Sequence, residues 1–243
     1  MKILIVRHAD PDYSIDSLTP TGWKEAELLS QRLAKLNIKA FYTSPLGRAK
    51  DTASLTLKKM NREATECTWL REFNTCPIMR PDKDQPIIAW DWLPQDWTSI
   101  PEHLDHNLWC TTDIMKAGNV DTEYKWVISE FDKLLASHGY LRENNYYRVT
   151  EATNDTIVIF SHFGAECVLL SHLLNVSPMI LWHGMCAAPS SVSTIVTEER
   201  RKGYAYFRMS SFGDISHLYA AGETPSFAAR FCEMYDNMDE RHD

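Results

Sequence analysis

The segment Lys2-Ile3-Leu4-Ile5-Val6-Arg7-His8 decides the fold of this chain. Four consecutive apolar residues are followed at once by two polar ones, which is typical of a short central strand buried on both faces of a parallel sheet. In open parallel sheets, ligands bind outside the carboxyl ends of the strands. We therefore expect Arg7 and His8 to lie at a ligand-binding edge.

A second segment has the same pattern. The apolar run from Thr156 to Phe160 is followed by Ser161 and His162, and an apolar helix is predicted to follow up to about Asn175. If the two strands are neighbours in the sheet, the imidazoles of His8 and His162 converge on one crevice.

Strands and helices alternate after the first strand. Thr19-Pro20 predicts the N-cap and first residue of an amphipathic helix over about 20–37, residues 40–43 predict a strand, and Ser44-Pro45 predicts the start of a helix over about 45–60. This order predicts an α/β fold, a three-layer α/β/α sandwich with a mostly parallel central sheet. Residues 193–197 and 204–209 predict a late hairpin.

With 243 residues, the chain is expected to form a single domain over residues 1–243. Residues 76–120 break the regular pattern, because five Pro and four of the eight Trp fall between them. We expect an irregular, embedded cap there. Its Trp residues pack in the core, or they line a wall over the crevice that selects an apolar or ring-bearing leaving group.

Composition excludes several classes of protein. The 25 basic and 33 acidic residues give a net charge of −8, which makes nucleic acid an unfavourable partner. No apolar run is long enough to span a membrane. The six Cys residues form no C-x-x-C motif, so we expect free thiols and a cytoplasmic location.

The polar residues after the strands suggest a pocket for a phosphoryl group. Arg48 lies in the first turn of the helix that follows the second predicted strand, at the same edge as Arg7 and the two His residues. Arg presents a planar fork that matches phosphate oxygens. His103 and His106, three residues apart in the predicted cap, are expected to be solvated residues rather than metal ligands.

Four motifs occur in a fixed order. They are Arg7-His8 after a strand, Ser44-Pro45-Leu46-x-Arg48-Ala49-x-x-Thr52-Ala53, Leu70-x-Glu72, and Ser161-His162-Phe163-Gly164. Together they resemble branch 1 of the histidine phosphatase superfamily, whose fold is also called phosphoglycerate mutase-like. The resemblance covers about residues 1–75 and 150–215.

The resemblance implies a phosphatase that hydrolyses a small-molecule phosphate ester without a metal or other cofactor. It makes His8 the nucleophile that becomes phosphohistidine and Glu72 the general acid and base. Arg7, Arg48 and His162 hold the phosphoryl oxygens, with His162 protonated.

Two departures from the family pattern bear on this expectation. Ala9 stands where the family commonly has Gly, and the role of Ser14 stays open. Phe73-Asn74 follows Glu72 where mutases carry other residues, and Arg200-Arg201 lies too late to match their paired Arg, so hydrolysis is favoured. The alternatives are a cofactor-dependent phosphoglycerate mutase and a non-catalytic phosphate-binding domain. Nothing in the sequence indicates the natural substrate or the oligomeric state.

Overall fold

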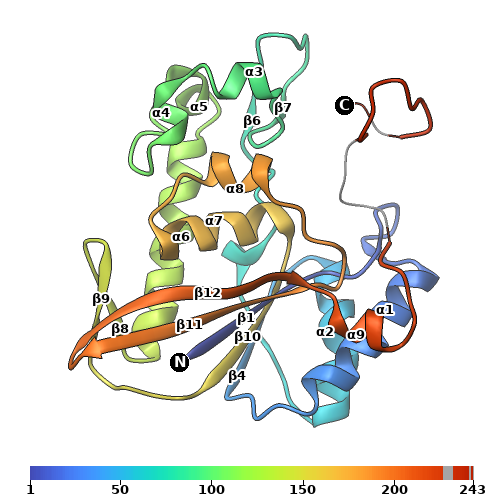
Figure 1. Ribbon diagram of the computed structural model, residues 1–243, viewed down its shortest axis with the longest axis vertical. Coiled ribbons are helices and arrows are strands. Elements are labelled where there is room, and N and C mark those ends of the chain that lie inside the picture. Colours follow the sequence, from blue (N-terminus) through green and yellow to red (C-terminus); the bar gives the residue numbers. More distant parts are fainter. Residues whose placement is uncertain (227–231, 241, 243) are drawn as a thin grey trace.

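An eight-stranded sheet forms the middle layer of the protein (Figure 1). The computed structural model describes residues 1–226, 232–240 and 242. The strand order is β5-β4-β10-β1-β11-β12-β9-β8. In chain order the strands are β1 (Lys2–Arg7), β4 (Ala40–Thr43), β5 (Thr65–Glu66), β8 (Tyr140–Glu143), β9 (Tyr146–Val149), β10 (Thr156–Ser161), β11 (Val192–Arg201) and β12 (Tyr204–Asp214).

The sheet is parallel in one half and antiparallel in the other. Strands β5, β4, β10 and β1 run parallel, as expected for the half that carries the predicted site. Strands β11, β12, β9 and β8 pair antiparallel, because short turns within the β8–β9 and β11–β12 hairpins reverse the chain. The α/β architecture is therefore confirmed, with a mixed sheet. The late hairpin is also confirmed, and it is longer at both ends than predicted.

Helices cover both faces of the sheet. One face carries α1 (Pro20–Leu33), α2 (Gly47–Met60) and α9 (Ser216–Ala220), and the other carries α6 (Val120–Ser137), α7 (Phe163–Leu174) and α8 (Pro178–Gly184) (Figure 1). None of the described helices is both long and apolar enough to cross a membrane.

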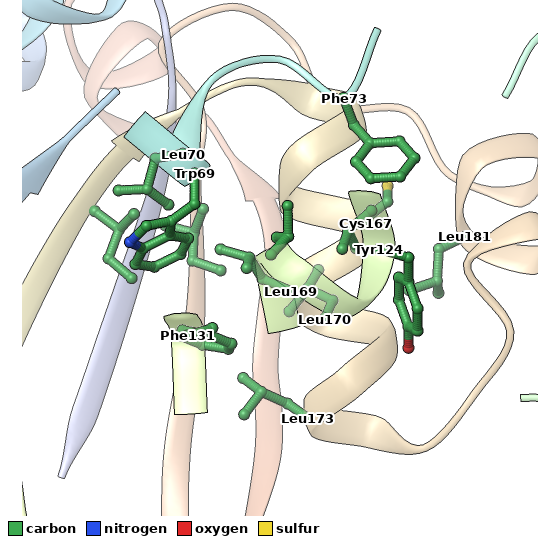
Figure 2. Packing of buried hydrophobic residues seen from close by; sticks show 14 of the residues in the cluster. Trp69, Leu70, Phe73, Tyr124, Phe131, Cys167, Leu169, Leu170, Leu173 and Leu181 are labelled. Carbon is green, nitrogen blue, oxygen red and sulfur yellow. The ribbon is translucent and has the colours of Figure 1, made fainter. Parts of the chain in front are cut away.

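The continuous apolar runs are explained by burial on both faces. Along β1, Ile3 and Ile5 pack with the core beneath α6 and α7, whereas Leu4 and Val6 pack with the core beneath α1. Residues of β10 alternate in the same way, since successive side chains of a strand point to opposite faces. Figure 2 shows the larger core, where Phe131 of α6 packs against Trp69 and Leu169, Leu170 and Leu173 of α7 belong to the same cluster.

The helix boundaries follow local capping chemistry. The side chain of Thr19 accepts a hydrogen bond from the backbone N–H of Gly22 at 3.0 Å, which confirms the predicted N-cap of α1. The prediction for α2 is wrong by two residues, because its N-cap is Leu46, whose side chain makes no capping bond. The hydroxyl of Ser44 is engaged by His162 instead, at 2.7 Å.

Residues 76–120 contain only short elements. They are β6 (Pro77–Ile78), β7 (Ile87–Ile88), α3 (Pro94–Trp97), α4 (Pro101–Leu104) and α5 (Asp113–Ala117). Together they lie above α8, beside the upper end of α6 (Figure 1). The remaining short elements are β2 (Pro11–Asp12), β3 (Ser17–Leu18) and a 3-10 helix, η1 (Thr68–Leu70).

Candidate active site

The two predicted His residues meet because their strands are adjacent and in register. Arg7 pairs with Ser161 across the parallel β1–β10 ladder, so His8 and His162 occupy equivalent positions just beyond the sheet. The backbone N–H of His8 donates to the carbonyl of Ser161 at 3.0 Å and extends the ladder by one step. The ring centroids lie 5.1 Å apart. One phosphoryl group can therefore touch both rings.

The ring of His8 is fixed by its own backbone. Its Nδ1 lies 2.8 Å from the carbonyl oxygen of Ala9, which can only accept a hydrogen bond. Neutral His8 therefore carries its proton on Nδ1, and the lone pair is on Nε2. Burial, and next the Arg7 guanidinium, lower the pKa of His8 from 6.5 to about 3. The unprotonated ring is thus the stable form at neutral pH.

Two Arg side chains border the same pocket, and both are buried. Arg7 donates through Nη1 to the carbonyl of Ala187. Arg48 lies in the first turn of α2, after β4, which pairs with β10. Its Nη1 donates to Oδ1 of Asp16 at 2.6 Å. The ends of three neighbouring strands thus supply two imidazoles and two guanidinium groups.

His162 is neutral in the ligand-free site. Burial and then the nearby His8 and Arg48 side chains lower its pKa well below 6.5. The expected protonated His162 belongs to the phosphate-bound site and stays a prediction, because without the anion a cation there meets two guanidinium groups and no solvent. A bound phosphate dianion would reverse this balance of charge.

Glu72 is held close to this pocket. Glu72 lies just after η1. The carbonyl of Leu70 in η1 accepts a hydrogen bond from the Ser161 hydroxyl at 2.9 Å, which ties this segment to the end of β10. Oε1 of Glu72 accepts backbone N–H groups of Phe73 at 2.8 Å and Ala165 at 3.0 Å. Burial raises the pKa of Glu72, although these two hydrogen bonds and the Arg side chains oppose the rise. A raised pKa suits a general acid.

Three further residues join the site without having been predicted from sequence. Asp16 pairs with Arg48, and its Oδ2 also accepts the backbone N–H of Gly47 at 2.7 Å. Ser44 contacts His162. Glu166, in the first turn of α7, is fully buried, and burial raises its pKa to about 7. Its signal in the sequence is an acidic residue in an otherwise apolar helix, four positions after His162.

Other polar residues have no place in this pocket. Ser14 is exposed and donates its hydroxyl to Asp12. His103 is fully buried and lies edge-on to Trp92, so the expectation that it is solvated is wrong.

Within residues 1–226, 232–240 and 242, no three His, Cys, Asp or Glu side chains are grouped to hold a metal ion. A cavity of about 510 Å³ lies at the opposite end of β1, beside Met1, Lys2 and Tyr140.

The fold and the site together define an α/β protein that gathers two imidazoles, two guanidinium groups and a carboxyl group at one edge of its sheet. Residues 3–105 match the model of the histidine phosphatase superfamily (branch 1). The match confirms the predicted resemblance to this superfamily over the first part of the chain and supports the expectation of a phosphatase. No curated protein matches the chain.

Solved structures share the fold at low sequence identity. A phosphoserine phosphatase of Entamoeba histolytica is 19% identical, with 89% of this chain and 98% of that one covered and a TM-score of 0.56. A mycobacterial glucosyl-3-phosphoglycerate phosphatase is 15% identical, with 89% and 98% covered and a TM-score of 0.58.

The buried His pair predicts a pH-dependent stability. Each His has a pKa below its unfolded value of about 6.5, so the unfolded chain binds protons that the folded protein does not. The free energy of unfolding should therefore fall as the pH drops from about 6.5 towards 4, by up to about 1.4 kcal/mol per pH unit for each His. Urea denaturation at a series of pH values measures this slope.

The matched control is the double variant His8→Asn/His162→Asn, which keeps all other titrating groups. Its slope should be flatter than that of the wild type over the same range. Equal slopes for the two proteins would contradict the inference that both rings are neutral when buried.

Proposed function

We propose that the protein hydrolyses small-molecule phosphomonoesters through a phosphohistidine on His8, without a metal ion. The observation that carries this proposal is the hydrogen bond between Nδ1 of His8 and the carbonyl of Ala9, which leaves the lone pair on Nε2 next to the Arg pair. Neutral imidazole is a nucleophile, and the pKa of about 3 keeps His8 in that form.

In the first step, Nε2 of His8 attacks phosphorus as the bond from phosphorus to the leaving oxygen breaks. Glu72, in its protonated form, gives its proton to that oxygen and becomes a carboxylate, and the protonated leaving group departs as an alcohol or phenol product. Arg7 and Arg48 hold the other phosphoryl oxygens and stabilise their negative charge, which is the main contribution of a protein to phosphoryl transfer. The charge that a metal supplies elsewhere comes here from the two guanidinium groups.

In the second step, the Glu72 carboxylate takes a proton from water while the water oxygen attacks phosphorus. The bond to Nε2 breaks, and inorganic phosphate and free His8 are regenerated. His162 binds a phosphoryl oxygen and takes up a proton when the dianion enters, since the anion offsets the Arg charges that keep it neutral.

The position of the Arg200-Arg201 pair favours hydrolysis over mutase chemistry, because mutases use paired Arg residues to hold a substrate carboxylate. Arg200 and Arg201 end β11, beyond the pairing of Lys2 with Val196 and thus at the far end of the sheet from His8. They cannot hold a substrate carboxylate in this pocket. The names of the structural neighbours, both phosphatases, also support hydrolysis.

The proposal also includes the domain organisation, the cap and the cellular location. The chain is one domain over residues 1–243, and residues 76–120 form a cap embedded in it, as their packing above α8 supports. A cytoplasmic location is supported by the six free thiols.

The nucleophile is tested with His8→Asn. This variant should lose at least about a thousandfold in kcat on an aryl phosphate, because the Asn amide offers no nucleophilic nitrogen lone pair. Quenching the wild type with alkaline detergent during turnover of a ³²P-labelled substrate should trap a base-stable label that acid releases and that the variant lacks. The control His138→Asn alters a ring that bonds the Tyr42 hydroxyl, remote from the pocket, and should keep full activity. Full activity of His8→Asn would refute the assignment.

The general acid is tested with Glu72→Gln. The amide cannot give up a proton, so alkyl phosphates, whose leaving groups are poor, should slow by about a hundredfold or more. Nitrophenyl phosphates, whose leaving groups need no proton, should slow much less. A series of esters compared by kcat for the wild type and the variant measures the difference. An equal loss across the series would remove Glu72 from this role.

A further inference from the structure

The cap approaches the site at Trp90. Its indole Nε1 donates to the carbonyl of Phe73 at 2.7 Å, and the N–H of the same Phe73 donates to Oε1 of Glu72. A Cβ placed on Gly164 would lie 2.6 Å from Oε1 of Glu72 and 2.7 Å from Nε1 of Trp90. The indole and the carboxyl group therefore both lie against Gly164, where only a glycine fits.

A second ring continues this wall towards the phosphoryl pocket. Phe163, the first residue of α7, meets Trp90 edge to face with ring centroids 6.1 Å apart. The guanidinium carbon of Arg7 lies 5.9 Å from the centre of the same Phe163 ring. Phe163 thus lies between the phosphoryl-binding Arg7 and the cap residue Trp90. Both aromatic side chains are only partly buried, unlike the His and Arg side chains of the pocket.

The order of these groups fixes what lies beside the leaving group. Glu72 must reach the leaving oxygen to protonate it, so the rest of the leaving group extends past Glu72 to the side where Trp90 and Phe163 stand. Aromatic faces bind flat rings by offset or edge contacts. The organic part of a bound substrate therefore lies along the aromatic wall formed by Trp90 and Phe163.

The charge of the cap argues against an anionic leaving group. Residues 76–120 contain seven acidic and three basic residues. One of the basic residues, Arg80, is buried and bonded to Asp82, with Asp91 3.8 Å away. A carboxylate on the leaving group would therefore meet a net negative cap.

We propose that Trp90 and Phe163 form the binding wall for the leaving group, and that the natural substrate carries a flat, uncharged ring next to its ester oxygen. This inference rests on the proposed function, because it takes Glu72 as the acid that protonates the leaving oxygen. It makes Trp90 a specificity-determining residue and, through the Phe73 peptide, a positioning residue for Glu72.

The ring preference is tested by binding, without turnover. Calorimetry should show that benzylphosphonate binds the wild type about tenfold more tightly than ethylphosphonate. Trp90→Ala should reduce this ratio to near one. The control Trp97→Ala removes another Trp of the cap, which stacks on His183 with centroids 4.9 Å apart, and should keep the ratio. Equal binding of the two phosphonates by the wild type would overturn the inference.

Trp90→Phe separates the two roles of the indole. It keeps an aromatic ring but loses the N–H that bonds the Phe73 carbonyl. The preference for benzylphosphonate should persist, while kcat on benzyl and ethyl phosphates should fall together by several-fold and KM should change little. A Trp90→Phe variant with unchanged kcat would overturn the positioning role.

Failure of this inference is distinguishable from failure of the proposed function. A wild type that prefers benzylphosphonate but hydrolyses no phosphomonoester would refute the hydrolytic function and leave the ring-binding wall in place. A wild type that hydrolyses benzyl and ethyl phosphates with equal kcat/KM would refute the wall and leave the hydrolytic function in place.

Discussion

The parallel pairing of β1 with β10 is the constraint on which the site depends. Because Arg7 is in register with Ser161, the next residue on each strand is a His, and the two rings stand side by side just past the sheet. The neighbouring strand β4 brings Arg48 to the same edge through the first turn of α2. A shift of one residue in the register would turn one strand's side chains to the other face and separate the rings.

This arrangement places cationic groups where water is largely excluded, and the protonation states follow from that. Burial first, and then the charge of the two guanidinium groups, keep both His rings neutral, while burial raises the pKa of Glu72 and Glu166. The cationic groups of the ligand-free site are therefore the Arg side chains and not the His rings, and a bound dianion can draw a proton onto His162. The same burial keeps His8 unprotonated and favours protonated Glu72, so one environment supports both of the proposed roles.

The parts of the site that lie on strands could be predicted from sequence, because an apolar run followed by a His shows where a buried strand ends. Asp16 and Ser44 could not, since their contacts with Arg48 and His162 depend on how separate loops fold together. The antiparallel half of the sheet was foreseen only as the late hairpin. The Trp-rich cap left two interpretations open, and Trp90, the residue that touches the site, has no local pattern that sets it apart from Trp92 or Trp97.

The position of a bound anion tests the central claim most directly. A crystal structure of the protein with orthovanadate should place the vanadium between the rings of His8 and His162, bonded to Nε2 of His8, with its oxygens contacting Arg7 and Arg48. Vanadate bound elsewhere, or bound in this pocket through neither imidazole, would contradict the account that these four groups surround a single phosphoryl unit.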